Sequence, residues 1–231
     1  MGKANLNNTA YEERLGTDRM LPLVLRMAMP SVAAQIVNLL YNLVDRIYIG
    51  HIPGIGTDAL AGIGVTGAII ILISAFSAIV SGGGAPLAAI ALGQGDRKRA
   101  GQTLGNGFVL LLIFTLLTTT LTYLFMEPLL MFTGASENTV GYAKDYLSIY
   151  LLGTLFVETS VGLNTFINTQ GRPAIAMYSV LIGAVLNIIL DPIFIFVMGM
   201  GVRGAALATV ISQACSALWI VSFLTSKRAS L

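Results

Sequence analysis

Residues 173–198 read PAIAMYSVLIGAVLNIILDPIFIFVM and contain a single charged side chain, Asp191. A bilayer core needs about 20 mainly apolar residues per helix, so this stretch is long enough to cross it. The whole chain agrees, because 55% of its residues are hydrophobic, 10% are charged and its mean hydropathy is +0.82. Soluble domains carry roughly a quarter charged residues, and a soluble fold of this size could not bury so much apolar surface. The sequence therefore predicts an all-α integral membrane protein.

Six apolar stretches follow one another along the chain, and short polar or glycine-rich segments separate them. Each stretch predicts one transmembrane helix. Together they form a domain from residue 21 to residue 225. It follows a polar N-terminal segment, 1–20, in which Thr17 or Asp18 can cap the first helix, and it precedes a polar end, 226–231. The predicted spans are 21–49, 60–92, 103–126, 142–169, 173–198 and 204–225.

Basic residues predict the orientation, because segments rich in Lys and Arg stay on the cytoplasmic side. With the N-terminus inside, the outer loops hold only Lys144 and Arg203. The inner segments then hold Lys3, Arg14, Arg19, Arg97, Lys98, Arg99, Arg172, Lys227 and Arg228. We therefore expect a multi-pass protein of the cell (plasma) membrane. Both termini, the N-terminal segment and the polar end, are expected to be cytoplasmic. The net charge of +2 is spread through separate loops, so no nucleic-acid partner is expected.

Polar residues recur along the first span at spacings of three and four, which places them on one face of a helix. These residues are Ser31, Gln35, Asn38, Asn42 and Asp45. Such a stripe fits either hydrogen bonding between helices or a polar network around a cavity. A carboxylate at bilayer depth costs a few kcal/mol, so Asp45 is a functional candidate by default.

The fifth and sixth spans offer partners for Asp45. Asn187 and Asp191 share a helix face because they are four residues apart. At a rise of about 1.5 Å per residue, Asp45, Asp191 and Thr209 each lie roughly 9–10 Å inside the outer end of their helix. Two carboxylates, an amide carbonyl and a hydroxyl would form an oxygen cluster that suits H⁺ or Na⁺, whereas Ca²⁺ wants a fuller shell. The alternative is a hydrogen-bonded plug between helices.

Other residues within the spans are harder to interpret. Glu158, with Thr154, can either line the interior of the bundle or bond to a neighbouring helix, and Arg46 can extend toward the membrane surface. Pro30 removes a backbone donor inside the first span and predicts a kink. Pro86 follows a serine–glycine run at 81–84 and fits either a hinge or close packing.

Five segments resemble the multidrug and toxic compound extrusion (MATE) family of secondary transporters. Their order, spacing and predicted topology all agree with that family, and the resemblance runs from about residue 20 to the end of the chain. The segments are MAMPSVAAQIVNLLYNLVDRIYIG at 27–50, ALGQGDRKRA at 91–100, NTQGRP at 168–173, VLNIILDPIFIF at 185–196 and GVRGAALATVISQ at 201–213.

The resemblance implies two lobes of six helices around a cavity that opens alternately to either side. It places a cation site of the N-terminal lobe on Asp45, Asn187, Asp191 and Thr209, and a bend of the first helix at Pro30. It also makes Tyr146 and Asn164 candidates for the same polar network. Export of drugs, organic cations or amphiphiles follows from the resemblance alone. The chain ends where the first lobe ends, so we expect a fragment whose second lobe is a missing C-terminal half or a second copy.

Three other classes of function fit the sequence less well. A flippase for lipid-linked saccharides would need a basic cavity, and Arg46 is the only base expected inside the membrane. A non-transporting membrane fragment would use the polar stripe only to join helices in the lipid bilayer. An enzyme is disfavoured, because the single histidine, His51, lies near an outer end without a nucleophile or metal-ligand pattern. We expect no catalytic residue, no cofactor beyond H⁺ or Na⁺ as coupling ion, and no disulfide from the single Cys215.

Overall fold

The computed structural model describes residues 20–226 and 229, which are helical apart from short turns and contain no strand. The predicted N-terminal segment 1–20, apart from Met20, lies outside these residues, as do Thr17, Asp18 and most of the predicted end 226–231. The elements are α2 (Met20–Gly50), α3 (Gly56–Ile79), η1 (Val80–Gly84), α4 (Ala85–Gly93), α5 (Arg97–Leu124), α6 (Met126–Phe132), α7 (Val140–Thr169), α8 (Pro173–Pro192), η2 (Ile193–Val197) and α9 (Val202–Leu224).

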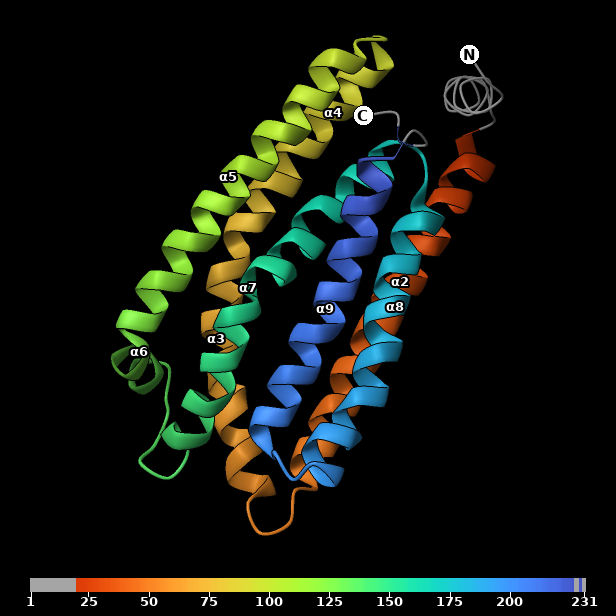
Figure 1. Cartoon of the computed structure of the whole chain (residues 1–231). Helices are drawn as coiled ribbons and strands as arrows, with labels where there is room; N and C mark the ends of the chain where they lie inside the picture. The colour runs from red at the N-terminus through yellow and green to blue at the C-terminus, as the bar shows by residue number, and fades with distance from the viewer. Residues whose placement is uncertain (1–19, 227–228, 230–231) are drawn as a thin grey trace.

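Within the described residues these elements form six long rods, because α3, η1 and α4 join into one rod and α8 and η2 into another (Figure 1). Each predicted span matches one rod to within six residues at either end, so the predicted all-α architecture is confirmed. The short helix α6 was not predicted and occupies the polar segment after the third span. Its seven residues are too few to cross a bilayer, so the chain still reverses direction there.

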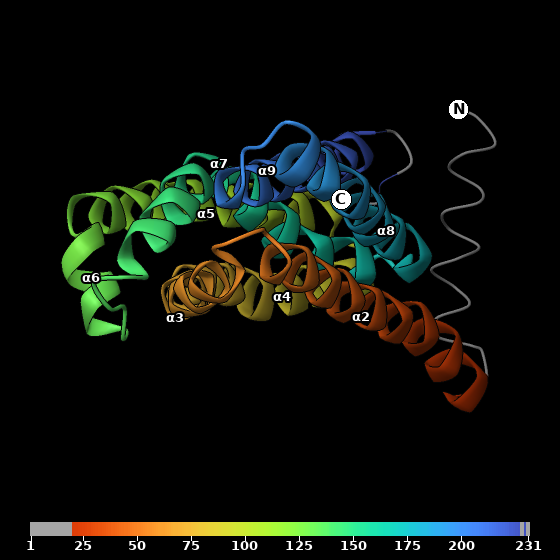
Figure 2. The ribbon, with the colours of Figure 1, turned by 90° about the horizontal axis from the view of Figure 1, so that it is seen from below.

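Five of the rods are long and apolar enough to cross a membrane, namely 56–93, 97–124, 140–169, 173–197 and 202–224. Helix α2 is not among them, although it is the longest single helix in the described chain and runs beside α8 (Figures 1 and 2). Polar side chains interrupt its apolar surface, which still exposes Val32, Leu39 and Leu43 along one side. The crossing of the membrane by α2 therefore remains a prediction.

Helix α7 lies at the centre of the bundle and makes its most extensive contact with α9. Figure 2 shows α7 with neighbours on several sides and α2 at the margin. Small residues permit the close approach, since a Cβ added at Gly153 would collide with both methyl groups of Val210 on α9. This contact fixes α9 in the position from which Thr209 reaches α8.

Two of the rods contain a wider π-helical turn, and each turn adjoins a proline. Pro86 lies at the start of α4, directly after η1, and Pro192 lies directly before η2. A proline cannot donate to the carbonyl four residues earlier and clashes with it. The π turn η1 precedes Pro86 and relieves that clash without breaking the rod, whereas η2 follows Pro192. For Pro86 the structure shows a continuous rod, and α2 likewise continues through Pro30 as one helix.

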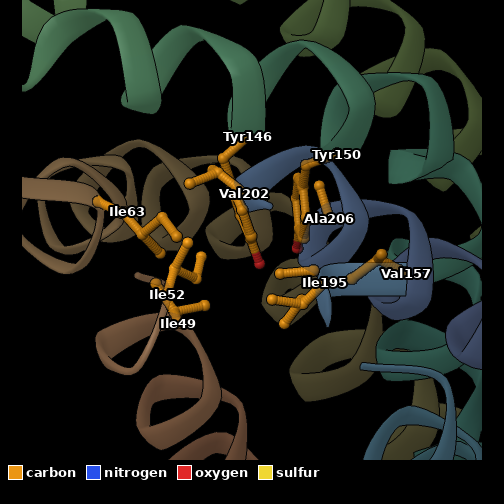
Figure 3. Packing of buried hydrophobic residues seen from close by; sticks show 11 residues of the cluster. Ile49, Ile52, Ile63, Tyr146, Tyr150, Val157, Ile195, Val202 and Ala206 are labelled. Atoms are coloured by element: carbon orange, nitrogen blue, oxygen red, sulfur yellow. The ribbon is translucent and has the colours of Figure 1, made fainter. Parts of the chain in front are cut away.

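Buried apolar side chains close the bundle near the α2–α3 and α8–α9 loops, here called the α2–α3 end (Figure 3). The opposite end, with the α4–α5 loop, is called the α4–α5 end. Tyr146 and Tyr150 point into this cluster from α7. The other buried members are Ile49, Ile52, Ala59, Ile63, Val157, Ile195, Val202, Ala205 and Ala206. The cluster lies between the loops and the polar site described below, so it separates that site from the α2–α3 end.

Candidate cation site

The residues predicted to form a cation site come together where α2, α8 and α9 meet. Asp45 of α2 is 9% exposed, Asn187 and Asp191 of α8 are 1% and 0% exposed, and Thr209 of α9 lies beside them. The carboxyl groups of Asp45 and Asp191 are neighbours, close enough for a hydrogen bond when one of them carries a proton. Helices α2 and α8, which are far apart in the sequence, thus bring two acids together.

The Asn187 amide holds the site together through its nitrogen. Its Nδ2 donates to Asp191 Oδ1 over 3.2 Å and to Thr209 Oγ1 over 3.4 Å, which links α8 to α9. This orientation leaves three buried acceptors without a donor, namely Asp45 Oδ1, Asn187 Oδ1 and Asp191 Oδ2. Buried acceptors nearly always have a partner, so this group of orphaned oxygens fits a bound proton or cation.

No basic side chain neutralises the two acids by an ion pair within the described chain. Arg46 follows Asp45 in the sequence and interacts with it electrostatically, but its side chain is exposed. The described residues also contain no group of three His, Cys, Asp or Glu side chains that could hold a metal ion. Carboxylate, amide and hydroxyl oxygens favour hard cations, and only two of these ligands carry charge. The donor set therefore suits a proton or a monovalent ion.

Two residues that were not predicted, Tyr41 and Gln213, lie around the site, together with Tyr146, which was predicted. Tyr41 is a hydrogen-bond neighbour of Gln213 and lies near both acids, while Tyr146 is a hydrogen-bond neighbour of Thr209. A signal for the two missed residues exists, because Tyr41 precedes Asp45 by four residues and Gln213 follows Thr209 by four. Each therefore lies on the same helix face as a predicted ligand.

The polar stripe of α2 divides between two places. Gln35, Asn38 and Asn164 line a separate cavity of about 90 Å³ between α2, α7 and α8, nearer the α4–α5 end. Asn164 Nδ2 donates to the Ala176 carbonyl and to Ser179 Oγ, over 3.1 and 2.6 Å. Asn42 is exposed and donates to the Asn38 carbonyl of its own helix. Gln35, Asn38 and Asn164 therefore lie outside the contacts that join Asp45, Asn187, Asp191 and Thr209, whereas Asn42 neighbours Tyr41 at the edge of the site.

Glu158 of α7 also lies apart from the two aspartates. The residue is 2% exposed, and its carboxylate accepts hydrogen bonds from Ser74 Oγ, over 2.9 Å, and from Ser77 Oγ, both on α3. Thr154, one turn earlier, instead donates to the Tyr150 carbonyl of its own helix. Of the two readings of Glu158, the structure places it in bonds to a neighbouring helix.

Comparison with known proteins identifies a matching family and several similar proteins. The MatE family model matches residues 30–193. The multidrug export protein MepA of Staphylococcus haemolyticus is 28% identical over 208 residues, which cover 90% of this chain and 46% of that protein. An FAD transporter of Shewanella oneidensis is 29% identical over 208 residues, or 88% of this chain and 44% of that one. A crystal structure of MATE in the bent conformation matches with a TM-score of 0.81 at 30% identity, over 89% and 45% of the two chains. The chain spans about half the length of the curated relatives it matches.

Proposed function

The chain belongs to the MatE family, and we propose that it forms the N-terminal lobe of a membrane exporter driven by H⁺ or Na⁺. One observation carries the proposal. Asp45, Asn187 and Asp191 each hold a buried oxygen without a hydrogen-bond donor at the junction of α2, α8 and α9. A purely structural plug would pair these oxygens, because an unpaired buried acceptor costs about 1–3 kcal/mol.

The two aspartates respond to the coupling ion through their charge. When both are ionised, two like charges face each other at low dielectric and repel. A bound H⁺ or Na⁺ removes this repulsion and lets Asp45 of α2 stay against Asp191 of α8. Ion binding therefore changes how firmly α2 is held to α8, and Pro30, inside α2, is the place where the helix can bend in response.

The substrate is proposed to be an organic cation or an amphiphile, which would bind between this lobe and a second one. The names of the relatives point to different cargoes, since one is a multidrug exporter and another an FAD transporter. The second lobe is proposed to lie against the exposed apolar side of α2, which includes Val32, Leu39 and Leu43. It can be a continuation of the chain or a second copy.

Replacement of the acids tests the coupling role. In everted vesicles that contain this lobe with its second lobe, Asp45→Asn and Asp191→Asn should abolish export of a cationic dye driven by a proton or sodium gradient. Asp58→Asn, at an exposed acid of α3, is the matched control and should retain export. The gradient that drives the unmodified protein identifies the ion. Undiminished export by either aspartate variant at normal expression overturns the proposal.

A further inference from the structure

We propose that Glu158, Ser74 and Ser77 form a second proton-binding site, separate from the aspartate pair, whose protonation state controls how α3 is held to α7. The site itself follows from the contacts of the described residues. Only its use in the transport cycle rests on the proposed function.

The contacts of Glu158 join two of the rods. Its two carboxylate oxygens accept from Ser74 and Ser77, so each oxygen has one serine of α3 as a partner. The two serines are three residues apart and share a face of α3. Glu158 and Ser77 are each 2% exposed and Ser74 is partly buried, so the three side chains form a largely buried interhelical hydrogen-bond group.

No described group compensates the charge of an ionised Glu158. Among the described residues, the hydrogen bonds that stabilise its carboxylate come from the two serines. On α7 itself the ionisable neighbour of Glu158 is Tyr150. The facing side chains are serines on α3 and Leu111 on α5. No described basic side chain of the neighbouring helices forms an ion pair with Glu158. An unpaired buried charge is expensive in a low-dielectric interior, so uptake of a proton is the simplest way to neutralise it.

Serine hydroxyls suit both states of such a site. A hydroxyl can donate one hydrogen bond and accept two. When the carboxylate is charged, both serines donate to it, as observed. When it is protonated, its own O–H donates to one serine, and that serine can turn its hydroxyl toward a carbonyl one turn back on α3. The group therefore stores and releases a proton without leaving a buried donor unpaired.

Tight packing favours a proton over a metal ion. Gly162, one turn beyond Glu158, has no room for a Cβ, which would collide with Leu111 of α5 and lie 3.7 Å from Ser77 Cβ. Four oxygens from three side chains fall short of the six or more that hard divalent cations take. A proton needs neither additional ligands nor additional space.

The site lies where its protonation state can affect how α7 holds the α3–α4 rod. Ser77 lies three residues before the π turn η1, and Phe166 of α7 lies against Gly84, the last residue of that turn. Helix α7 thus contacts the α3–α4 rod just before its π turn and again at the end of that turn. Loss of the proton leaves an uncompensated charge at the first of these contacts, so we expect the rod to loosen around the π turn when Glu158 is ionised.

Infrared difference spectroscopy of the purified chain in lipid, recorded as the pH is changed, tests the site. We expect a protonated-carboxyl band that titrates, that is absent in Glu158→Gln and that persists in the double variant Asp45→Asn/Asp191→Asn. Glu137→Gln, at an exposed acid, should leave the band unchanged. Persistence in the double variant separates this proposal from the aspartate site. A band that does not titrate, or that disappears with the aspartates, overturns it.

Amide hydrogen exchange supplies the second readout. Exchange of residues 74–84 should increase with pH in the unmodified chain beyond its intrinsic pH dependence, and Glu158→Gln should remove the increase because an amide cannot ionise. Equal pH dependence in both proteins contradicts the proposed control of α3. Should Glu158→Gln fail to fold, Ser74→Ala and Ser77→Ala remain. Each removes a donor, so the pH at which the band titrates must change, and an unchanged titration overturns the proposal.

Discussion

At the scale of single residues, the orientation of one amide determines what the candidate site can bind. Asn187 uses its nitrogen to hold Asp191 and Thr209, and its oxygen is left free beside free oxygens of both acids. A flipped amide would turn its nitrogen toward the free oxygens, remove an ion ligand and take away the present donor of Asp191 Oδ1. The carboxylate of Asp191 can only accept when it is ionised, and its bond from the nitrogen therefore favours the observed orientation.

The Thr209 hydroxyl can be removed with little change in shape. We expect Thr209→Val to weaken binding of the coupling ion about fivefold, because one hydrogen bond contributes roughly 1 kcal/mol and 1.4 kcal/mol corresponds to a factor of ten. Thr209→Ser keeps the hydroxyl and should bind as the unmodified chain does. The ion concentration at half-saturation, read from infrared titration of the purified protein, checks both. Equal weakening by both variants would mean that the methyl group matters and the hydroxyl does not.

The sequence indicates some of these residues better than others. Asp45, Asn187 and Asp191 are conspicuous because a charge or amide within an apolar stretch is costly. Ser74 and Ser77 are not, because small hydroxyl residues are common in membrane helices and their partner, Glu158, is some 80 positions away. Spacing can place two residues on one face of a helix, but only the packing of α3 against α7 brings these three together.

At the scale of elements, the bundle depends on how closely α7 and α9 approach. Gly153 lies against Val210 with no space for a side chain between the helices. Since α9 carries Thr209, the residue next to Val210, any separation of α7 from α9 also displaces one side of the candidate site.

A methyl group at this contact tests its importance. We expect Gly153→Ala to destabilise the chain by about 1–3 kcal/mol, the usual cost of overpacking. Val210→Ala in the same chain removes the two methyl groups and should recover most of the loss. Gly141→Ala is the control, because this glycine of α7 has open space around it. Thermal unfolding in detergent, followed by circular dichroism, measures all three. Additive losses in the double variant would refute the proposed collision.

Element boundaries were predictable, whereas local winding was not. Long apolar stretches bounded by polar turns define the rods, since lipid permits few alternatives. The π turns at η1 and η2 need a comparison of proline sterics with the packing of neighbouring helices, which no local pattern reports. Helix α6 could be predicted neither from an apolar stretch nor from the packing of its neighbours, because its seven residues contain an acid and a proline and resemble a loop.

At the scale of the whole molecule, the two ends of the bundle differ in charge. The α4–α5 end carries the basic run 97–99 and Arg172. At the α2–α3 end, Lys144 pairs with Glu127 over 2.7 Å and Arg203 pairs with Asp145 over 2.8 Å. The loops of that end therefore have few basic residues, and Lys144 and Arg203 are each paired with an acid. This difference supports the predicted orientation, in which the α4–α5 end is cytoplasmic.

Labelling of single cysteines tests this orientation. In a Cys215→Ala background, Thr57→Cys places a thiol in an exposed position at the α2–α3 end, and Gln94→Cys places one at the α4–α5 end. A membrane-impermeant maleimide added to intact cells should label the first variant, because its thiol faces the outside. It should label the second only after the membrane is opened, since the basic run beside Gln94 is expected to stay in the cytoplasm. The reverse pattern would invert the topology and would place the apolar cluster of Figure 3 between the cation site and the cytoplasm. The coupling ion would then have to approach the aspartates by the opposite route.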